Sequence, residues 1–122
     1  MSRKRLLTVL MVATAVLMLG GFAAAQAIYI PVISKGFQHQ FWQAVRLGAE
    51  KAARDYKVVI TFEGPENESM VDKQLDMLQT DLAKNPSAIC FAALDSKAAI
   101  PLLQEKARQH QAAGDVRLGL VL

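Results

Sequence analysis

Residues 28–114 alternate between short apolar runs and longer stretches in which apolar residues recur every three or four positions. The apolar runs are rich in β-branched residues and are bounded by turn residues, which is typical of buried strands. The longer stretches have the periodicity of helices that bury one face. In chain order, the pattern predicts a strand at 28–33, a helix at 38–56, a strand at 58–62, a helix between Ser69 and Asn85, a strand at 88–92 and a helix from Asp95 to about Ala113.

Side chains at the helix ends and along the first helix refine this prediction. Ser69, followed by Asp72, resembles a capping box and predicts the start of the second helix. Asp95 or Ser96 can cap the third helix, and Pro101 is expected in its first turns or at a kink. The apolar stripe of the first helix is expected to comprise Phe41, Val45, Gly48 or Ala49, Ala52 and Tyr56.

The alternation of strands and helices indicates an α/β fold. We expect three layers, with a doubly wound parallel sheet between helices, because strands that are apolar throughout are covered on both faces. The crossovers between such strands are expected to be right-handed, and if the strand order is 2-1-3, the first and third strands are neighbours. Ligands bind such sheets beyond the carboxyl ends of the strands. The two loops expected to meet there are residues 34–42 and 93–96.

The first of these loops has an unusual composition for a ligand site. Three aromatic residues are interleaved with two glutamines and a histidine. Flat rings stack on the C–H faces of a sugar, while amides and carboxylates hydrogen-bond its hydroxyl groups, so the loops favour a sugar ligand. The candidate ligand-binding residues are Lys35, Gln38, His39, Phe41, Trp42 and Asp95.

Each of the more informative candidates also has a purely structural interpretation. Phe41 lies on the apolar stripe and fits core packing almost as well as ligand stacking, whereas Trp42 lies one step off the stripe. His39 can cap the first helix, and Asp95 can cap the third. Lys35 is equally compatible with a solvated loop residue. The sequence leaves these alternatives open.

The amino terminus predicts an export signal. Arg3, Lys4 and Arg5 precede an apolar run at 6–19, and small residues follow at 23–27. This is the layout of a cleaved signal peptide, here residues 1–27, with cleavage after Ala25 or Ala27. A membrane anchor is the alternative, although the apolar run is short for a bilayer.

Composition excludes several classes of function. The formal net charge of +3 depends on the three basic residues of the signal, and no later stretch indicates nucleic-acid binding. The single cysteine, Cys90, cannot form an internal disulfide. His39 and His110 are too far apart in sequence for a good metal site, and no pattern predicts a cofactor or a catalytic nucleophile. We therefore expect no metal, no cofactor and no enzymatic activity.

Three segments resemble the periplasmic sugar-binding proteins, which are the ribose-binding-like, type I solute-binding components of ABC importers. The resemblance lies in residues 34–49, where the strand-1 loop leads into the first helix, in the second strand and turn at 61–65, and in the third-strand loop at 92–98. It covers about residues 28–114.

The resemblance implies two α/β lobes, joined by a hinge, that close on one sugar. Phe41 and Trp42 would stack on the sugar ring, Gln38 and His39 would bond its hydroxyl groups, and Asp95 would bind paired hydroxyls. The implied ligand is a monosaccharide or a similar polyol. The other implied properties are a monomer in the periplasm, no cofactor, and a membrane ABC permease as the partner.

The chain departs from the family pattern after Gly114. The family continues into a fourth apolar strand, whereas Asp115 and Arg117 fit such a buried strand poorly. We therefore divide the chain into a signal at 1–27, a partial amino-terminal lobe with three strands at 28–114, and an aberrant tail at 115–122. A fragment without the second lobe is expected to bind sugar weakly or not at all.

Two other kinds of protein could be built on the same sheet. One is a secreted α/β enzyme or ligand-sensing domain. The other is the ligand-binding core of a bacterial repressor, in which a DNA-binding helix-turn-helix precedes the core. In this chain the predicted signal peptide occupies that position.

Overall fold

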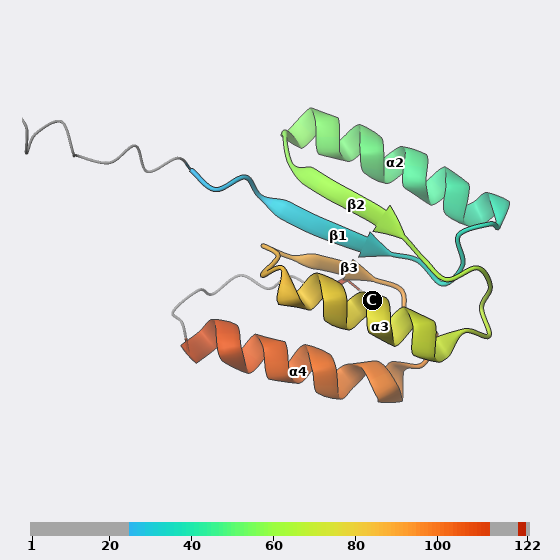
Figure 1. Ribbon diagram of the computed structural model, residues 1–122. Coiled ribbons are helices and arrows are strands. Elements are labelled where there is room, and N and C mark those ends of the chain that lie inside the picture. The colour runs from blue at the N-terminus through green and yellow to red at the C-terminus, as the bar shows by residue number, and fades with distance from the viewer. Residues whose placement is uncertain (1–24, 113–119, 122) are drawn as a thin grey trace, which may run out of the picture.

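The computed structural model describes residues 25–112 and 120–121 (Figure 1). Its elements follow the predicted order of strands and helices. They are β1 (Tyr29–Ile33), α2 (Gln40–Tyr56), β2 (Val59–Glu63), α3 (Val71–Ala83), β3 (Ile89–Phe91), α4 (Ser96–Ala112) and β4 (Leu120–Val121). The predicted signal peptide lies outside the described residues, except for residues 25–27, which are exposed.

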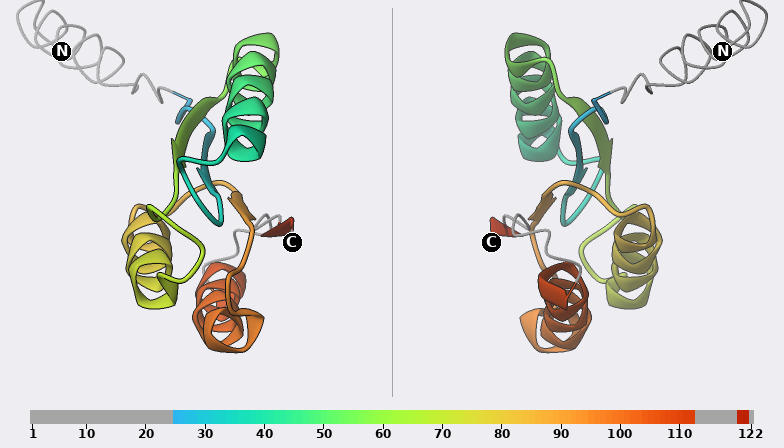
Figure 2. Two further views of the ribbon diagram at one scale, coloured as in Figure 1. Left: turned by 90° about the vertical axis from the view of Figure 1, so that its right-hand side faces the viewer. Right: turned by 90° about the vertical axis from the view of Figure 1, so that its left-hand side faces the viewer.

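All strand pairs in the sheet are parallel, in the order β2-β1-β3-β4. Helix α2 lies on one face of the sheet, and α3 and α4 lie on the other (Figure 2). The predicted three-layer α/β fold is therefore confirmed, and the condition that the first three strands lie in the order 2-1-3 is met. None of the helices in the described ranges combines the length and the apolar character that a membrane span needs.

The sheet has one strand more than the sequence predicted for residues 28–114. Leu120 and Val121 pair with Ile89 and Cys90 and form the short strand β4. The three strands predicted for residues 28–114 are therefore confirmed, and β4, in the segment predicted to be an aberrant tail, supplies backbone partners for the outer edge of β3. Asp115 and Arg117, on which the predicted departure from the family pattern rested, lie outside the described residues.

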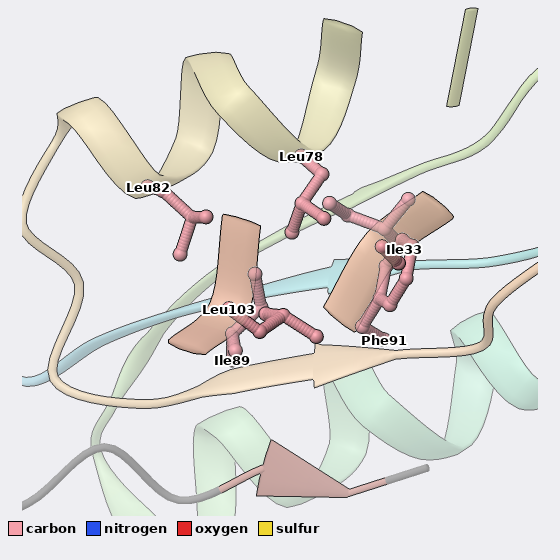
Figure 3. Close-up of a cluster of buried hydrophobic side chains, with 7 residues drawn as sticks. Ile33, Leu78, Leu82, Ile89, Phe91 and Leu103 are labelled. Carbon is pink, nitrogen blue, oxygen red and sulfur yellow. The ribbon is translucent and has the colours of Figure 1, made fainter. Parts of the chain in front are cut away.

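The hydrophobic core fills the space between the sheet and helices α3 and α4 (Figure 3). The buried residues of this core come from two strands and two helices. They are Ile33, Leu78, Leu82, Ile89, Phe91, Ala99 and Leu103. Burying each of the larger side chains stabilises the fold by about 1.5–3 kcal/mol. Most of the stabilisation therefore comes from the α3–α4 face of the sheet.

The predicted apolar stripe of α2 was wrong in its phase. Phe41 is 59% exposed and Tyr56 is 80% exposed. The face of α2 that packs on the sheet is displaced by about one residue from the predicted stripe. On this face Trp42 and Val45 are half-buried and Ala53 is buried. The apolar pattern could not separate these stripes because both contain Val45 and because the exposed side of α2 also carries apolar residues.

The start of α3 also differs from the prediction. The helix begins at Val71 with Met70 as its N-cap, and no side chain forms a capping hydrogen bond there. The Asn67 side-chain oxygen accepts hydrogen bonds from the Ser69 backbone N–H, at 3.0 Å, and from the Ser69 hydroxyl. Ser69 therefore belongs to a turn before the helix, because an asparagine two residues earlier organises the backbone locally.

Helix α4 begins as the sequence indicated. Asp95 Oδ1 accepts a hydrogen bond from the Ala98 backbone N–H at 3.1 Å, which is the bond of an N-cap side chain. Pro101 lies inside α4, in its second turn. Its missing N–H leaves one carbonyl of the first turn without its usual helical donor.

A half-buried carboxyl group at the end of β2, Glu63, lies near a buried carboxyl group in α3, Asp81. Asp81 is fully buried, and its Oδ1 accepts hydrogen bonds from Lys84 Nζ at 2.8 Å and from the Tyr29 hydroxyl at 3.4 Å. Burial raises the pKa of Glu63, and the charge and hydrogen bond of Asp81 raise it further, against the opposing charges of Lys84 and Lys73. A proton held on Glu63 gives Asp81 an additional hydrogen-bond donor.

This pair predicts an acid-dependent contribution to stability. Because the folded pKa of Glu63 is raised, the contribution is complete below the unfolded pKa and is lost as pH rises through the folded pKa. Glu63→Gln keeps a donor toward Asp81 at every pH, so the variant should unfold at a higher temperature than the wild type near neutral pH. The gain should shrink in acid.

Thermal unfolding over a pH series measures this difference, with Glu66→Gln in the next loop as the exposed control. A gain that is the same at all pH values would contradict a contribution from protonation of Glu63.

Two glycines in different environments provide a second test. A Cβ on Gly64 would overlap the Ser34 hydroxyl oxygen and would lie 3.1 Å from the Ser34 carbonyl oxygen. Gly64→Ala should therefore lower the free energy of unfolding by about 1–3 kcal/mol. Gly48 has no atom within 4 Å of a Cβ position, so Gly48→Ala in α2 should raise it by about 1 kcal/mol. Urea unfolding of both variants measures these changes in the free energy of unfolding. Equal changes in the two variants would contradict the predicted difference between the two positions.

Candidate functional site

The loops after β1 and β3 lie side by side at the carboxyl edge of the sheet. Val32 pairs with Cys90 and Ile33 with Phe91, and the Ala92 backbone N–H donates to the Ile33 carbonyl at 3.0 Å. The predicted meeting of these two loops is therefore confirmed. Parallel sheets of this kind bind ligands at such an edge.

The loop after β1 is attached to the end of β2. Ser34 is buried, and both its backbone N–H and its hydroxyl donate to the Glu63 carbonyl, at 2.8 and 3.1 Å. The Phe37 backbone N–H donates to the Pro65 carbonyl at 2.9 Å. Gln43, in the first turn of α2, donates from its side-chain amide to the Phe37 carbonyl. These bonds hold the loop in one conformation as it enters α2.

His39 is the N-cap of α2. Its Nδ1 accepts a hydrogen bond from the Phe41 backbone N–H at 3.1 Å, which satisfies one of the unpaired donors of the first turn. In the neutral ring this bond places the proton on Nε2, which remains a donor. Gln38 and His39 are exposed, and Lys35 is half-buried. The capping role is compatible with a ligand contact through Nε2.

Phe41 and Trp42 form a ring pair at the start of α2. Their centroids are 4.9 Å apart and their planes meet at 79°. Phe41 is mostly exposed, whereas Trp42 is half-buried and lines an apolar hollow of about 160 Å³ against the sheet. The edge-to-face contact fixes the two rings relative to each other, so that they present apolar surface in two directions.

Glu68, in the loop after β2, lies beside Trp42. Trp42 Nε1 donates to Glu68 Oε1 at 3.5 Å, and both side chains lie close to Gly36. Glu68 is not among the candidate residues predicted from the sequence. Its only signal was its position after the second strand, at the same edge of the sheet as the other loops.

Asp95 lies in the loop after β3 and is exposed. The bond that caps α4 uses Oδ1, and a carboxylate has a second oxygen with which it can accept a hydrogen bond. Among the residues that the structure describes, no group of three or more His, Cys, Asp or Glu side chains could hold a metal ion. The chemistry of this edge is that of rings, amides and single carboxylates.

Gln74 is a buried polar residue that sequence reasoning missed. It lies in α3 and is only 1% exposed. Its side-chain amide N–H groups donate to the carbonyls of Ser34 and Ala92, and its oxygen accepts from the Leu94 backbone N–H. The available signal was a polar residue on the apolar side of a helix, one position before Leu75.

Two solved structures have a similar fold over most of this chain. One, from Brachyspira murdochii, is described as "ABC transporter, LacI family transcriptional regulator" and is 41% identical to this chain. Its TM-score is 0.61, and the match covers 77% of this chain and 27% of that chain. A carbohydrate transporter solute-binding protein from Agrobacterium radiobacter, in complex with D-arabinose, is 27% identical, with a TM-score of 0.66 over 80% of this chain and 30% of that chain. The chain therefore spans less than a third of either protein.

No curated protein matches the chain significantly. A family model described as "Periplasmic binding protein domain" matches residues 28–111, which include every described element except α4's last residue and β4. This match agrees with the resemblance in the sequence and with the likeness to the two solved structures. The chain therefore belongs to the periplasmic binding protein domain family.

Proposed function

We propose that this chain supplies one side of the sugar-binding cleft in the solute-binding component of an ABC importer. The observation that carries the proposal is the ring pair of Phe41 and Trp42, which lies at the same edge of the sheet as the Asp95 loop. The relative from Agrobacterium radiobacter, which carries D-arabinose, supports a monosaccharide or a similar polyol as the ligand.

The proposed contacts divide between apolar and polar groups. The exposed ring of Phe41 and the accessible part of Trp42 stack on the C–H face of the sugar. Gln38, the Nε2–H of His39 and the free oxygen of Asp95 bond its hydroxyl groups. Lys35, at the start of the loop, adds a cationic donor.

Binding in this proposal involves no chemical step, so the protein is not an enzyme. The ligand is buried when a second lobe closes over it, and a membrane permease recognises the closed form. The protein acts as a monomer and uses neither a metal nor a cofactor. In this arrangement residues 28–114 form part of the first lobe, and β4 adds a short strand to the same sheet.

The proposed place of action is the periplasm. Residues 1–27 would direct export and be removed after Ala25 or Ala27, where the small residues fit the signal peptidase. Amino-terminal sequencing of the protein recovered from the periplasmic fraction should begin at Gln26 or Ile28. Recovery of a membrane-bound chain that still begins at its first residues would instead support the anchor.

Stacking can be tested on the chain itself with D-arabinose as the probe. Because residues 28–121 supply only one side of the proposed cleft, we expect weak, millimolar-range binding by this chain, visible as sugar-dependent shifts of backbone amide resonances. Trp42→Ala should lose about 1–3 kcal/mol of binding free energy. Tyr56→Ala removes an exposed ring at the opposite end of α2 and should leave the shifts unchanged. Saturable micromolar binding by the wild type, or equal losses in both variants, would contradict the proposal.

Asp95 allows its two roles to be separated. Asparagine is as good an N-cap as aspartate but carries no charge, so Asp95→Asn should preserve α4 and the melting temperature. The same variant should weaken the response to D-arabinose several-fold, because hydrogen bonds to ionised acceptors are about twice as strong. Asp55→Asn, on the exposed side of α2, is the matched control. An unchanged response in Asp95→Asn would limit Asp95 to capping.

A further inference from the structure

The amide group of Gln74 is fully engaged at the carboxyl edge. Nε2 donates to the Ser34 carbonyl at 2.8 Å and to the Ala92 carbonyl at 2.9 Å, and Oε1 accepts from the Leu94 N–H at 2.8 Å. The orientation of the amide is unambiguous, because the reversed group would place its oxygen against two carbonyl oxygens. Both donors and the acceptor therefore have partners in a side chain that is almost completely buried.

These partners belong to the two loops that carry the candidate ligand-binding residues. Ser34 opens the loop that leads to Trp42, and Leu94 immediately precedes Asp95. The strand ladder between β1 and β3 ends with the bond from Ala92 to Ile33. Beyond that bond, no backbone hydrogen bond joins the two loops within the described residues.

We propose that Gln74 is a positioning residue that fixes the loop after β1 against the loop after β3. Its amide sets the spacing between the ring pair and Asp95, and so determines how well a sugar can meet both at once. The inference rests on the proposed function, but the hydrogen bonds on which it depends exist without a ligand. Gln74 itself has no contact with the sugar in this proposal, since its donors and its acceptor are all used by the backbone.

The test compares Gln74→Met with Gln79→Met in the full chain. Methionine preserves the length of the side chain but removes all three hydrogen bonds, and Gln79 is exposed on the same helix. Hydrogen exchange of the Leu94 amide should become about tenfold faster in Gln74→Met and should not change in Gln79→Met. The fluorescence of Trp42, the only tryptophan of the chain, should shift in the first variant alone.

Leu82→Ala separates positioning from a general loss of stability. Leu82 lies in the core near the other end of α3, away from the carboxyl edge, and its truncation should destabilise the fold. In Leu82→Ala we expect the Leu94 amide to exchange no faster than the lower global stability of the variant requires. The response to D-arabinose should be unchanged. Gln74→Met should weaken that response about tenfold. If Gln74→Met does not fold, Gln74→Glu, which keeps an acceptor but loses both donors, replaces it, with Gln79→Glu as the control.

The outcomes distinguish the two proposals. Faster Leu94 exchange in a chain that shows no response to D-arabinose would support the positioning role and contradict the sugar site. Unchanged exchange and unchanged fluorescence in the Gln74 variant would overturn the positioning role, whatever the sugar response. Equal losses of the sugar response in Leu82→Ala and Gln74→Met would also overturn it.

Discussion

The parallel pairing of β1 with two neighbours is the constraint on which the rest of the structure depends. β1 pairs along its whole length with β2 and at its carboxyl end with β3. Because the three strands run in the same direction, their following loops emerge at one edge. Every candidate ligand-binding residue, and also Glu68 on the loop after β2, comes from one of these loops or from the first turn of α2.

The sequence predicted the strands and the helices well, because each strand is a compact apolar run between turn residues. It failed where local competition decided the outcome. Asn67 holds Ser69 in a turn before α3, and the sheet-facing stripe of α2 includes Trp42 instead of Phe41. β4 was missed because the chain reaches it after a segment whose charged residues do not look like a strand.

The sequence predicted the side chains that line the candidate site, but not the buried residue that holds its loops together. The ring pair and the Asp95 cap had recognisable side-chain signals, whereas the role of Gln74 had almost none. Its partners are backbone groups 18 to 40 residues away, and every residue type carries such groups. Long-range side-chain bonds to the backbone leave no pattern in a single sequence. They are found only when the fold brings both ends together.

The two faces of the sheet are unequally packed. Nearly all of the fully buried apolar side chains lie on the α3–α4 face, whereas α2 contributes only Ala53. We therefore expect α2, as the more lightly packed unit, to open at a lower free energy than the α3–α4 layer. The rings proposed to meet the sugar are therefore carried by the less constrained unit. Ligand preference can then change through substitutions in α2 with little effect on the part of the molecule that keeps it folded.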